Sequence, residues 1–111
     1  MQRGDIVVCV SSDDYGKPRP AVIVQTDLFN KTHATLTICP FTTHLIEASL
    51  FRLLISPTKQ NGLKEASQIM VDKITSIKRD KIHQKTGTLT ADQIQKLDDA
   101  ILLWLDLNNM N

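Results

Sequence analysis

One arginine in this sequence stands between two prolines, directly before an apolar run. Pro18, Arg19 and Pro20 precede the segment "AVIVQT". Each proline fixes its own φ, so the backbone is stiff on both sides of the guanidinium and less entropy is lost when that side chain is held in one place. A guanidinium has a fork of N–H donors that matches two phosphate oxygens, and it stays charged at any working pH. The tripeptide therefore indicates a site for a phosphate group.

Two threonines follow a second apolar run, in the segment "PFTTH". If both runs are neighbouring antiparallel strands, the start of one lies beside the end of the other, and Arg19 converges with Thr42. The alternative is an ordinary surface, on which Thr42 caps a turn and Arg19 forms an ion pair with a carboxylate. The carboxylates in question are those of Asp13, Asp14 and Asp27. The residues alone leave both interpretations open.

Four other side chains near this pair are candidates for substrate contacts. Lys17 is expected to contact a backbone phosphate without reading sequence. Thr43 and His44 directly follow Thr42, and we expect His44 to contact the substrate or to be simply exposed, although an imidazole also suits proton transfer. Tyr15, in the preceding polar loop, is the aromatic side chain best placed to stack on a base.

The sequence lacks the usual signatures of cofactor and metal sites. It contains no GxGxxG, GxxxxGK[ST], HExxH or CxxC motif, and His33, His44 and His83 are spread without ligand spacing. We therefore expect no cofactor and no metal. Cys9 and Cys39 both lie in apolar runs, where a free thiol behaves as a small buried hydrophobe.

Composition limits the chain to one ordinary globular domain, which we place at residues 1–111. It has 111 residues, 41% of them hydrophobic and 23% charged, and a net charge of +1. Residues 1–89 carry a net +4 and residues 90–111 a net −3, so a polyanion could bind to the body of the domain. No signal peptide opens the chain and no apolar run could cross a bilayer, which predicts a cytoplasmic protein with no membrane partner.

Apolar runs separated by turn signals predict short strands followed by a single helix. The helix begins after Thr90, which forms a capping box with Gln93, and an apolar stripe that ends in Trp104 is expected to be buried. The loop before "AVIVQT" contains two prolines and is expected to be irregular. The strands are expected at residues 5–10, 21–26, 34–40, 50–56, 67–77 with a bend near Asp72, and 83–89. This order predicts an α+β domain with a curled, mostly antiparallel sheet in a half-open barrel, whose edges favour a homodimer.

Five blocks of this chain, in order and without large gaps, resemble the MazF/PemK/Kid toxins of bacterial type II toxin–antitoxin modules. They are "RGDIVVCV", "KPRPAVIVQTDLFN", "TLTICPFTTH", "GLKEASQIMVDKITSIKRDKI" and "GTLTADQIQKLDDAILLWLDL". The resemblance implies a homodimeric SH3-like barrel of the CcdB/PemK type, with a C-terminal helix. It also implies an endoribonuclease, or mRNA interferase, that arrests growth by cutting single-stranded RNA at a short sequence without metal. A cognate antitoxin would neutralise it, and DNA would be contacted only through the toxin–antitoxin complex.

In the mechanism that the resemblance implies, the ribose 2′-hydroxyl attacks the adjacent phosphate. The family's catalytic arginine and hydroxyl fall on Arg19 and Thr42. Many relatives have an arginine where this chain has Thr75, and some have one at Met70.

Two other functions remain open at this level. The CcdB toxins share the implied barrel and dimer but are not enzymes, since they bind and poison DNA gyrase through the C-terminal helix. The RP and PxT motifs, at Arg19 and Thr42, distinguish the two classes, because a gyrase binder does not need them. An inactive module that binds RNA or an antitoxin would follow if Arg19 were ion-paired inside the protein.

Overall fold

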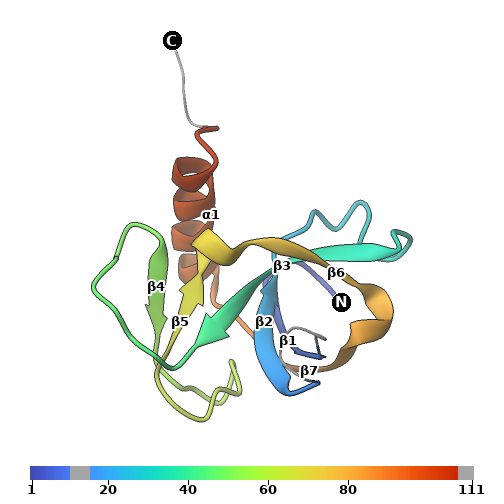
Figure 1. Cartoon of the computed structure of the whole chain (residues 1–111), viewed down its shortest axis with the longest axis horizontal. Coiled ribbons are helices and arrows are strands. Elements are labelled where there is room, and N and C mark those ends of the chain that lie inside the picture. The colour runs from blue at the N-terminus through green and yellow to red at the C-terminus, as the bar shows by residue number, and fades with distance from the viewer. Residues whose placement is uncertain (11–15, 108–111) are drawn as a thin grey trace.

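In the part of the chain that the structure describes, seven antiparallel strands form one curled sheet, which a single C-terminal helix covers at one end (Figure 1). The computed structural model describes residues 1–10 and 16–107. The strand order is β4-β5-β3-β2-β1-β7, and β6 pairs with β3 off this path. The elements are β1 (Asp5–Val10), β2 (Pro18–Ile23), β3 (Thr35–Thr42), β4 (Arg52–Ile55), β5 (Ser67–Met70), η2 (Val71–Lys73), β6 (Thr75–Lys78), η3 (Arg79–Lys81), β7 (Ile82–Thr88) and α1 (Ala91–Trp104). The predicted α+β class with a curled antiparallel sheet is confirmed, and the sheet is not closed into a full barrel.

The central strands are apolar because they are buried on both faces. One face of the sheet and α1 enclose a core that includes Ile6, Val22 and Leu97, all fully buried. The inside of the curl encloses a second core that includes Val7, Ile23 and Leu36. Neighbouring residues of one strand point to opposite faces, so an uninterrupted apolar run fills both cores. Cys9 and Cys39 are buried, free thiols in these two cores, as predicted.

The helix begins as the sequence predicted but does not bury its whole apolar stripe. Thr90 and Gln93 form the capping box through reciprocal hydrogen bonds of 3.1 and 2.9 Å between each side chain and the other residue's backbone N–H. Leu97 is buried, whereas Trp104 is 46% exposed, so the predicted burial of Trp104 is wrong. The C-terminal part of α1 extends beyond the sheet (Figure 1), and there the Trp104 ring contacts the Phe51 ring, with 5.3 Å between the centroids.

The second strand begins three residues earlier than predicted, so Arg19 lies within β2 and not before it. Pro18 and Pro20 are part of the strand, opposite Val10 and Val8 of β1, although prolines were expected to keep this segment irregular. Neighbouring residues of a strand direct their N–H groups to opposite sides. Pro18 and Pro20 are two residues apart, so their missing N–H groups are on the same side of β2. Pairing of β2 with β3 begins only at Ala21, beyond the prolines.

The strand expected at residues 67–77 is split at the predicted bend into β5, η2 and β6. Both strands pair with β3, but with different halves of it: Ile69 lies opposite Phe41, and Ile77 opposite Leu36. Val71, fully buried, anchors the short 3-10 turn between them. The break follows from the curl of the sheet, because one straight strand cannot follow both halves of β3.

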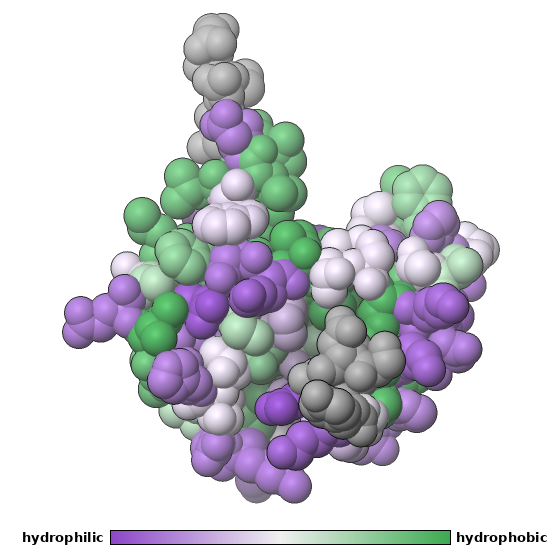
Figure 2. Space-filling model, viewed as in Figure 1, coloured by the Kyte–Doolittle hydropathy of each residue, from purple (hydrophilic) through white to green (hydrophobic). Residues whose placement is uncertain are grey.

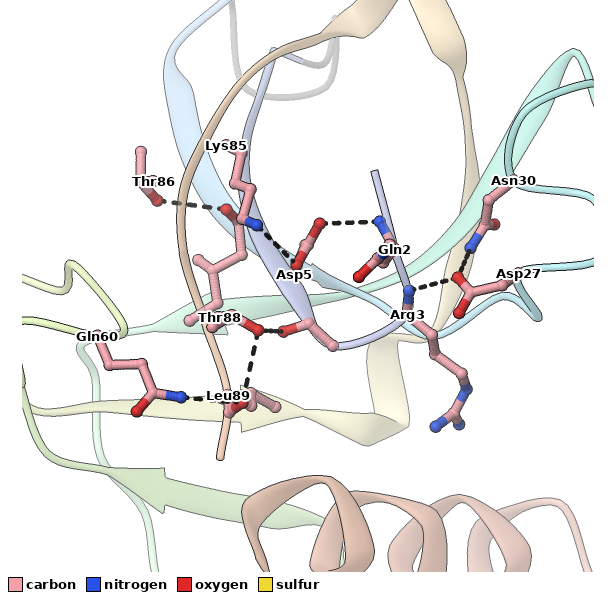
Figure 3. A network of polar contacts seen from close by, with 12 residues as sticks. Gln2, Arg3, Asp5, Asp27, Asn30, Gln60, Lys85, Thr86, Thr88 and Leu89 are labelled. Carbon is pink, nitrogen blue, oxygen red and sulfur yellow. Dashed lines mark hydrogen bonds and ion pairs between the residues drawn. The ribbon is translucent and has the colours of Figure 1, made fainter. Parts of the chain in front are cut away.

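A polar network joins the chain's beginning to β7 (Figure 3). The Asp5 carboxylate is nearly buried, accepts a hydrogen bond from the Gln2 backbone N–H at 2.8 Å and pairs with Lys85 at 3.3 Å. Thr88 Oγ1 donates to the Gly4 carbonyl at 3.3 Å. These contacts fix β7 against β1.

No helix within residues 1–10 and 16–107 has the length and apolar character needed to span a membrane.

Candidate functional site

A hollow of about 540 Å³ opens where the pairing of β3 passes from β6 to β5. We call it the Lys73 hollow. Its polar lining residues are Arg19, Thr42, Lys73, Thr75 and Ser76, and its apolar ones are Cys9, Pro20, Ala21, Ile38, Pro40, Phe41, Met70 and Ile77. A charged and hydroxylated rim over an apolar floor suits a ligand with an anionic part and a flat or apolar part.

Strand register brings the two predicted catalytic residues to this hollow. Ala21 lies opposite Pro40, and the antiparallel direction carries the chain from there back to Arg19 on β2 and forward to Thr42 on β3. Arg19 is exposed and Thr42 is half-buried, and both line the Lys73 hollow. The neighbouring strands inferred from sequence are therefore present, and they bring a guanidinium and a hydroxyl to one cavity.

Thr42 also closes a turn, as the alternative interpretation required. Its Oγ1 accepts a hydrogen bond of 3.1 Å from the backbone N–H of His44. This bond fixes the position of the oxygen and leaves the hydroxyl hydrogen to be donated elsewhere, since a hydroxyl both accepts and donates. Asp27, one of the carboxylates considered for Arg19, accepts hydrogen bonds of 2.8 Å from the Arg3 backbone N–H and from Asn30 (Figure 3).

The other four predicted site residues are not gathered in the same way. Thr43 is exposed and lines a second hollow next to the first. Lys17 and His44 are exposed and do not line the Lys73 hollow. Tyr15, like Asp13 and Asp14, lies outside the described residues. The structure thus brings together Arg19 and Thr42 but does not add the flanking residues to their cavity.

Lys73 is the lining residue that the sequence reasoning missed. It follows Asp72 in η2, at the break between β5 and β6, and lines the hollow together with Met70 and Thr75. These last two are the positions at which relatives were expected to have arginine. The only signal in the sequence was the predicted bend near Asp72, because a residue at a bend leaves the alternation of the strand.

An ion pair behind the hollow holds this turn in place. Arg52 Nε and Nη2 donate to the two oxygens of Asp72 at 2.7 and 3.0 Å. The hydrogen bonds from Arg52 are the main cause that lowers the pKa of Asp72, and they raise the pKa of Arg52. Neighbouring Lys73 also lowers the pKa of Asp72, but its contribution is smaller than that of Arg52.

The thiol at the floor of the hollow is not a candidate nucleophile. Burial raises the pKa of Cys9 to about 11, so the reactive thiolate is scarce at neutral pH. Within the part of the chain that the structure describes, no three His, Cys, Asp or Glu side chains form a group that could hold a metal ion. The chemistry available at the hollow is therefore that of two cations and several hydroxyls.

Comparisons with known proteins assign the family. Residues 2–105 match the family described as PemK-like, MazF-like toxin of type II toxin–antitoxin system. A curated relative, the probable endoribonuclease MazF of Mycolicibacterium smegmatis (strain ATCC 700084 / mc(2)155), is 39% identical over 108 residues, which cover 96% of this chain and 98% of the relative. This chain therefore belongs to the PemK-like, MazF-like toxins, as the sequence resemblance indicated.

Solved structures of this family have the same fold. The Mycobacterium tuberculosis toxin MazF-mt6 aligns with a TM-score of 0.79 at 22% identity and covers 92% of this chain and 96% of its own. A mycobacterial endoribonuclease solved in complex with its cognate antitoxin aligns with a TM-score of 0.81 at 20% identity, over 96% of both chains. These likenesses establish that the curled sheet with its C-terminal helix is the MazF fold.

Proposed function

We propose that this toxin is an endoribonuclease that cuts single-stranded RNA at the rim of the Lys73 hollow. The observation that carries the proposal is the meeting of Arg19 and Thr42 in one cavity, in a chain of this family. The curated relatives named as MazF endoribonucleases support RNA as the substrate. The gyrase-poison alternative has no comparable support, since these relatives are named as RNA-cleaving enzymes.

In the proposed reaction the ribose 2′-oxygen attacks the adjacent phosphorus and the bond from phosphorus to the 5′-oxygen breaks. The products are a 2′,3′-cyclic phosphate and a 5′-hydroxyl, which takes up a proton as the 2′-hydroxyl loses one. The intermediate phosphorane carries more negative charge than the phosphodiester. A fixed cation stabilises the phosphorane more than the substrate, which is the condition for raising the rate.

Arg19 is the group that we assign to this charge stabilisation. Its backbone is held by the pairing of Cys9 with Arg19 across β1 and β2, and a proline stands on either side. This preorganisation means that little reorganisation is needed when the charge develops. Thr42, its oxygen already fixed by the His44 N–H, is assigned to donate its hydrogen to a non-bridging phosphate oxygen.

Lys73 supplies a second positive charge from η2, the short turn between β5 and β6. An ammonium is a compact charge that can meet a phosphate from several directions, so we assign Lys73 to hold a phosphate rather than to orient it. No carboxylate or imidazole is found among the described residues that line the Lys73 hollow. We therefore assign the acceleration to charge stabilisation and positioning, and keep Lys17, Thr43 and His44 as contacts with the flanking RNA.

We also propose a homodimer and neutralisation by an antitoxin. The exposed apolar side chains Leu103, Trp104, Leu105 and Leu107 extend along the end of α1, where Figure 2 shows hydrophobic surface. Exposed apolar surface of this kind favours a covering protein. The similar structure of an endoribonuclease with its cognate antitoxin supports a protein partner of that class.

We place the activity in the cytoplasm, where the proposed substrate is found, and assign DNA contact only to a toxin–antitoxin complex.

The direct test is cleavage of a single-stranded RNA by purified protein in excess EDTA. We expect discrete products whose 5′ ends are labelled by polynucleotide kinase without phosphatase treatment, because the reaction leaves a 5′-hydroxyl. Products that need phosphatase first would contradict 2′-hydroxyl attack. Cleavage that is abolished by EDTA and restored by a divalent ion would contradict the residue assignment.

A further inference from the structure

A second hollow lies on the other side of Arg19. It has a volume of about 540 Å³ and shares Arg19 and Pro20 with the Lys73 hollow. We call it the Glu65 hollow. The proline-flanked segment of β2 thus contributes to two cavities of similar size, and Arg19 lines both of them.

The Glu65 hollow has the lining that a nucleobase needs. Val8, Pro18 and Leu63 provide apolar surface for the face of a ring, and these side chains are short or rigid. Polar groups for the edge of a ring come from Thr43, Lys64 and Glu65. Bases of single-stranded RNA are splayed out, so both their faces and their Watson–Crick edges can be read in this way.

The loop that carries Lys64 and Glu65 is held rigidly by Asn61, which is 1% exposed. Its Oδ1 accepts hydrogen bonds from the backbone N–H groups of Thr58 and Leu63 at 2.9 and 3.0 Å. Its Nδ2 donates to the Ser56 carbonyl at 2.8 Å. A buried amide with three such bonds fixes the turn around it, so the residues that follow have a defined place.

Two close backbone approaches attach this loop to β7. A Cβ added to Gly62, whose φ is +68°, would lie 2.2 Å from the Thr86 carbonyl oxygen, and one added to Gly87 would lie 2.3 Å from the Asn61 carbonyl. Glycine is required where backbones come this close. Ser67 Oγ then donates to the Glu65 backbone carbonyl at 2.9 Å. The Glu65 hollow is therefore preformed on a rigid frame.

Glu65 is an exposed carboxylate. Across residues 1–10 and 16–107, its side-chain oxygens have no hydrogen bond or ion pair. An ionised carboxylate only accepts hydrogen bonds. It matches the amino group of cytosine, adenine or guanine, whereas uracil presents carbonyl oxygens on both sides of its single ring N–H.

We propose that the Glu65 hollow binds the base of a nucleotide next to the phosphate at Arg19, and that Glu65 selects a base with an amino group over uracil. This inference rests on the proposed function, because it takes the phosphate at Arg19 as the point of cleavage. The RNA strand passes over Arg19, and its two flanking nucleotides enter the Glu65 and Lys73 hollows. Lys64, beside Glu65 in the wall, is the donor for a ring nitrogen or carbonyl of the same base.

The test is sequencing of the 5′ ends produced from an RNA pool with random bases. The wild-type protein should deplete uracil at least fivefold at one of the two positions that flank the cut. Glu65→Gln adds an amide donor for the uracil carbonyls and should remove most of that depletion. Glu47→Gln, which changes the chain's only other glutamate, should leave the distribution unchanged. Identical distributions for wild type and Glu65→Gln would overturn the proposal.

A binding measurement decides the same point without cleavage. Cytidine and uridine 5′-monophosphates differ only at the base edge, where cytosine has an amino group and a bare ring nitrogen and uracil has a carbonyl and a ring N–H. Each can be titrated while the backbone N–H signals of Lys64 and Glu65 are followed by NMR. We expect cytidine monophosphate to bind at least fivefold more tightly, with the difference lost in Glu65→Gln. Equal binding would reject the base preference. A protein that prefers cytidine monophosphate yet cuts no RNA would refute the proposed function and keep the base subsite.

Discussion

Two arginines of this molecule occupy opposite kinds of surroundings. Arg52 is bound through two hydrogen bonds to Asp72, and the two side chains are only 12% and 16% exposed. Arg19 is exposed, with a proline on either side. The first arginine stabilises a turn of the protein by pairing with a fixed carboxylate. The second lines two cavities that a ligand can enter, and its backbone is held in the pairing of β2 with β1.

Removing Arg19 should have the largest effect on activity. In Arg19→Ala we expect kcat/KM for RNA cleavage to fall by about 100-fold or more, because a preorganised charge at the phosphorane is lost. Single-turnover cleavage of a labelled RNA measures this. Lys31→Ala removes one exposed positive charge from a distant loop and should change the rate by less than about threefold. An Arg19→Ala protein that is folded and as active as Lys31→Ala would remove Arg19 from the mechanism.

Removing the hydroxyl of Thr42 should have a smaller effect on the same reaction. We expect Thr42→Val to lose about tenfold or more in kcat, since one neutral hydrogen-bond donor to the phosphate is missing. The matched control is Thr42→Ser, which keeps both the donor and the acceptor for the His44 N–H. If Thr42→Ser were as slow as Thr42→Val, the methyl group and not the hydroxyl would be the important part.

Breaking the other arginine's pair should reduce stability instead. Arg52→Met leaves the half-buried Asp72 carboxylate without its partner, at an expected cost of about 2 kcal/mol in the free energy of unfolding. Urea unfolding measures this. Adding Asp72→Leu to Arg52→Met should recover part of the loss, because no unpaired charge remains. A double variant less stable than Arg52→Met alone would show that the carboxylate contributes through other contacts.

The same pair should give the protein a defined acid sensitivity. The pKa of Asp72 is lower in the folded chain than in the unfolded one, so the unfolded state binds more protons between the two values. The stabilisation is therefore complete above the ordinary aspartate pKa of about 4 and is lost as the pH falls through the lower folded value. As the pH is lowered from about 6 to about 2, the free energy of unfolding, measured with urea, should fall more steeply in wild type than in Asp72→Asn. Parallel curves would contradict this contribution.

The smallest effect is expected at Cys9, although it lines the hollow and lies opposite Arg19 in the pairing of β1 with β2. With its pKa raised to about 11, the thiol should react slowly with iodoacetamide at pH 8, where roughly one thiol in a thousand is ionised. The rate should increase as the pH approaches that value. Urea-unfolded protein provides the control and should react quickly. Rapid alkylation of the native protein at pH 8 would show that the floor of the hollow is not part of the core.

Much of the fold could be predicted from the sequence, because it depends on local patterns. The first strand, Asp5–Val10, follows from an uninterrupted run of mostly β-branched residues, and the capping box at Thr90 follows from side-chain chemistry within a few residues. The burial of Trp104 was predicted wrongly because an apolar stripe cannot show where the covering sheet ends. The start of β2 was misplaced because two prolines look irregular until one knows which side of the strand is paired.

The sequence by itself determined the chemistry of the candidate site: a guanidinium with stiff flanks, a hydroxyl after the next strand, and the family to which both belong. Only the tertiary structure decided which residues share the cavity. Lys73 enters it because β3 is paired by two separate strands, and the Glu65 hollow exists because Gly62 and Gly87 let distant backbones touch. Such contacts depend on register and curl, which are properties of the whole sheet and not of any one segment.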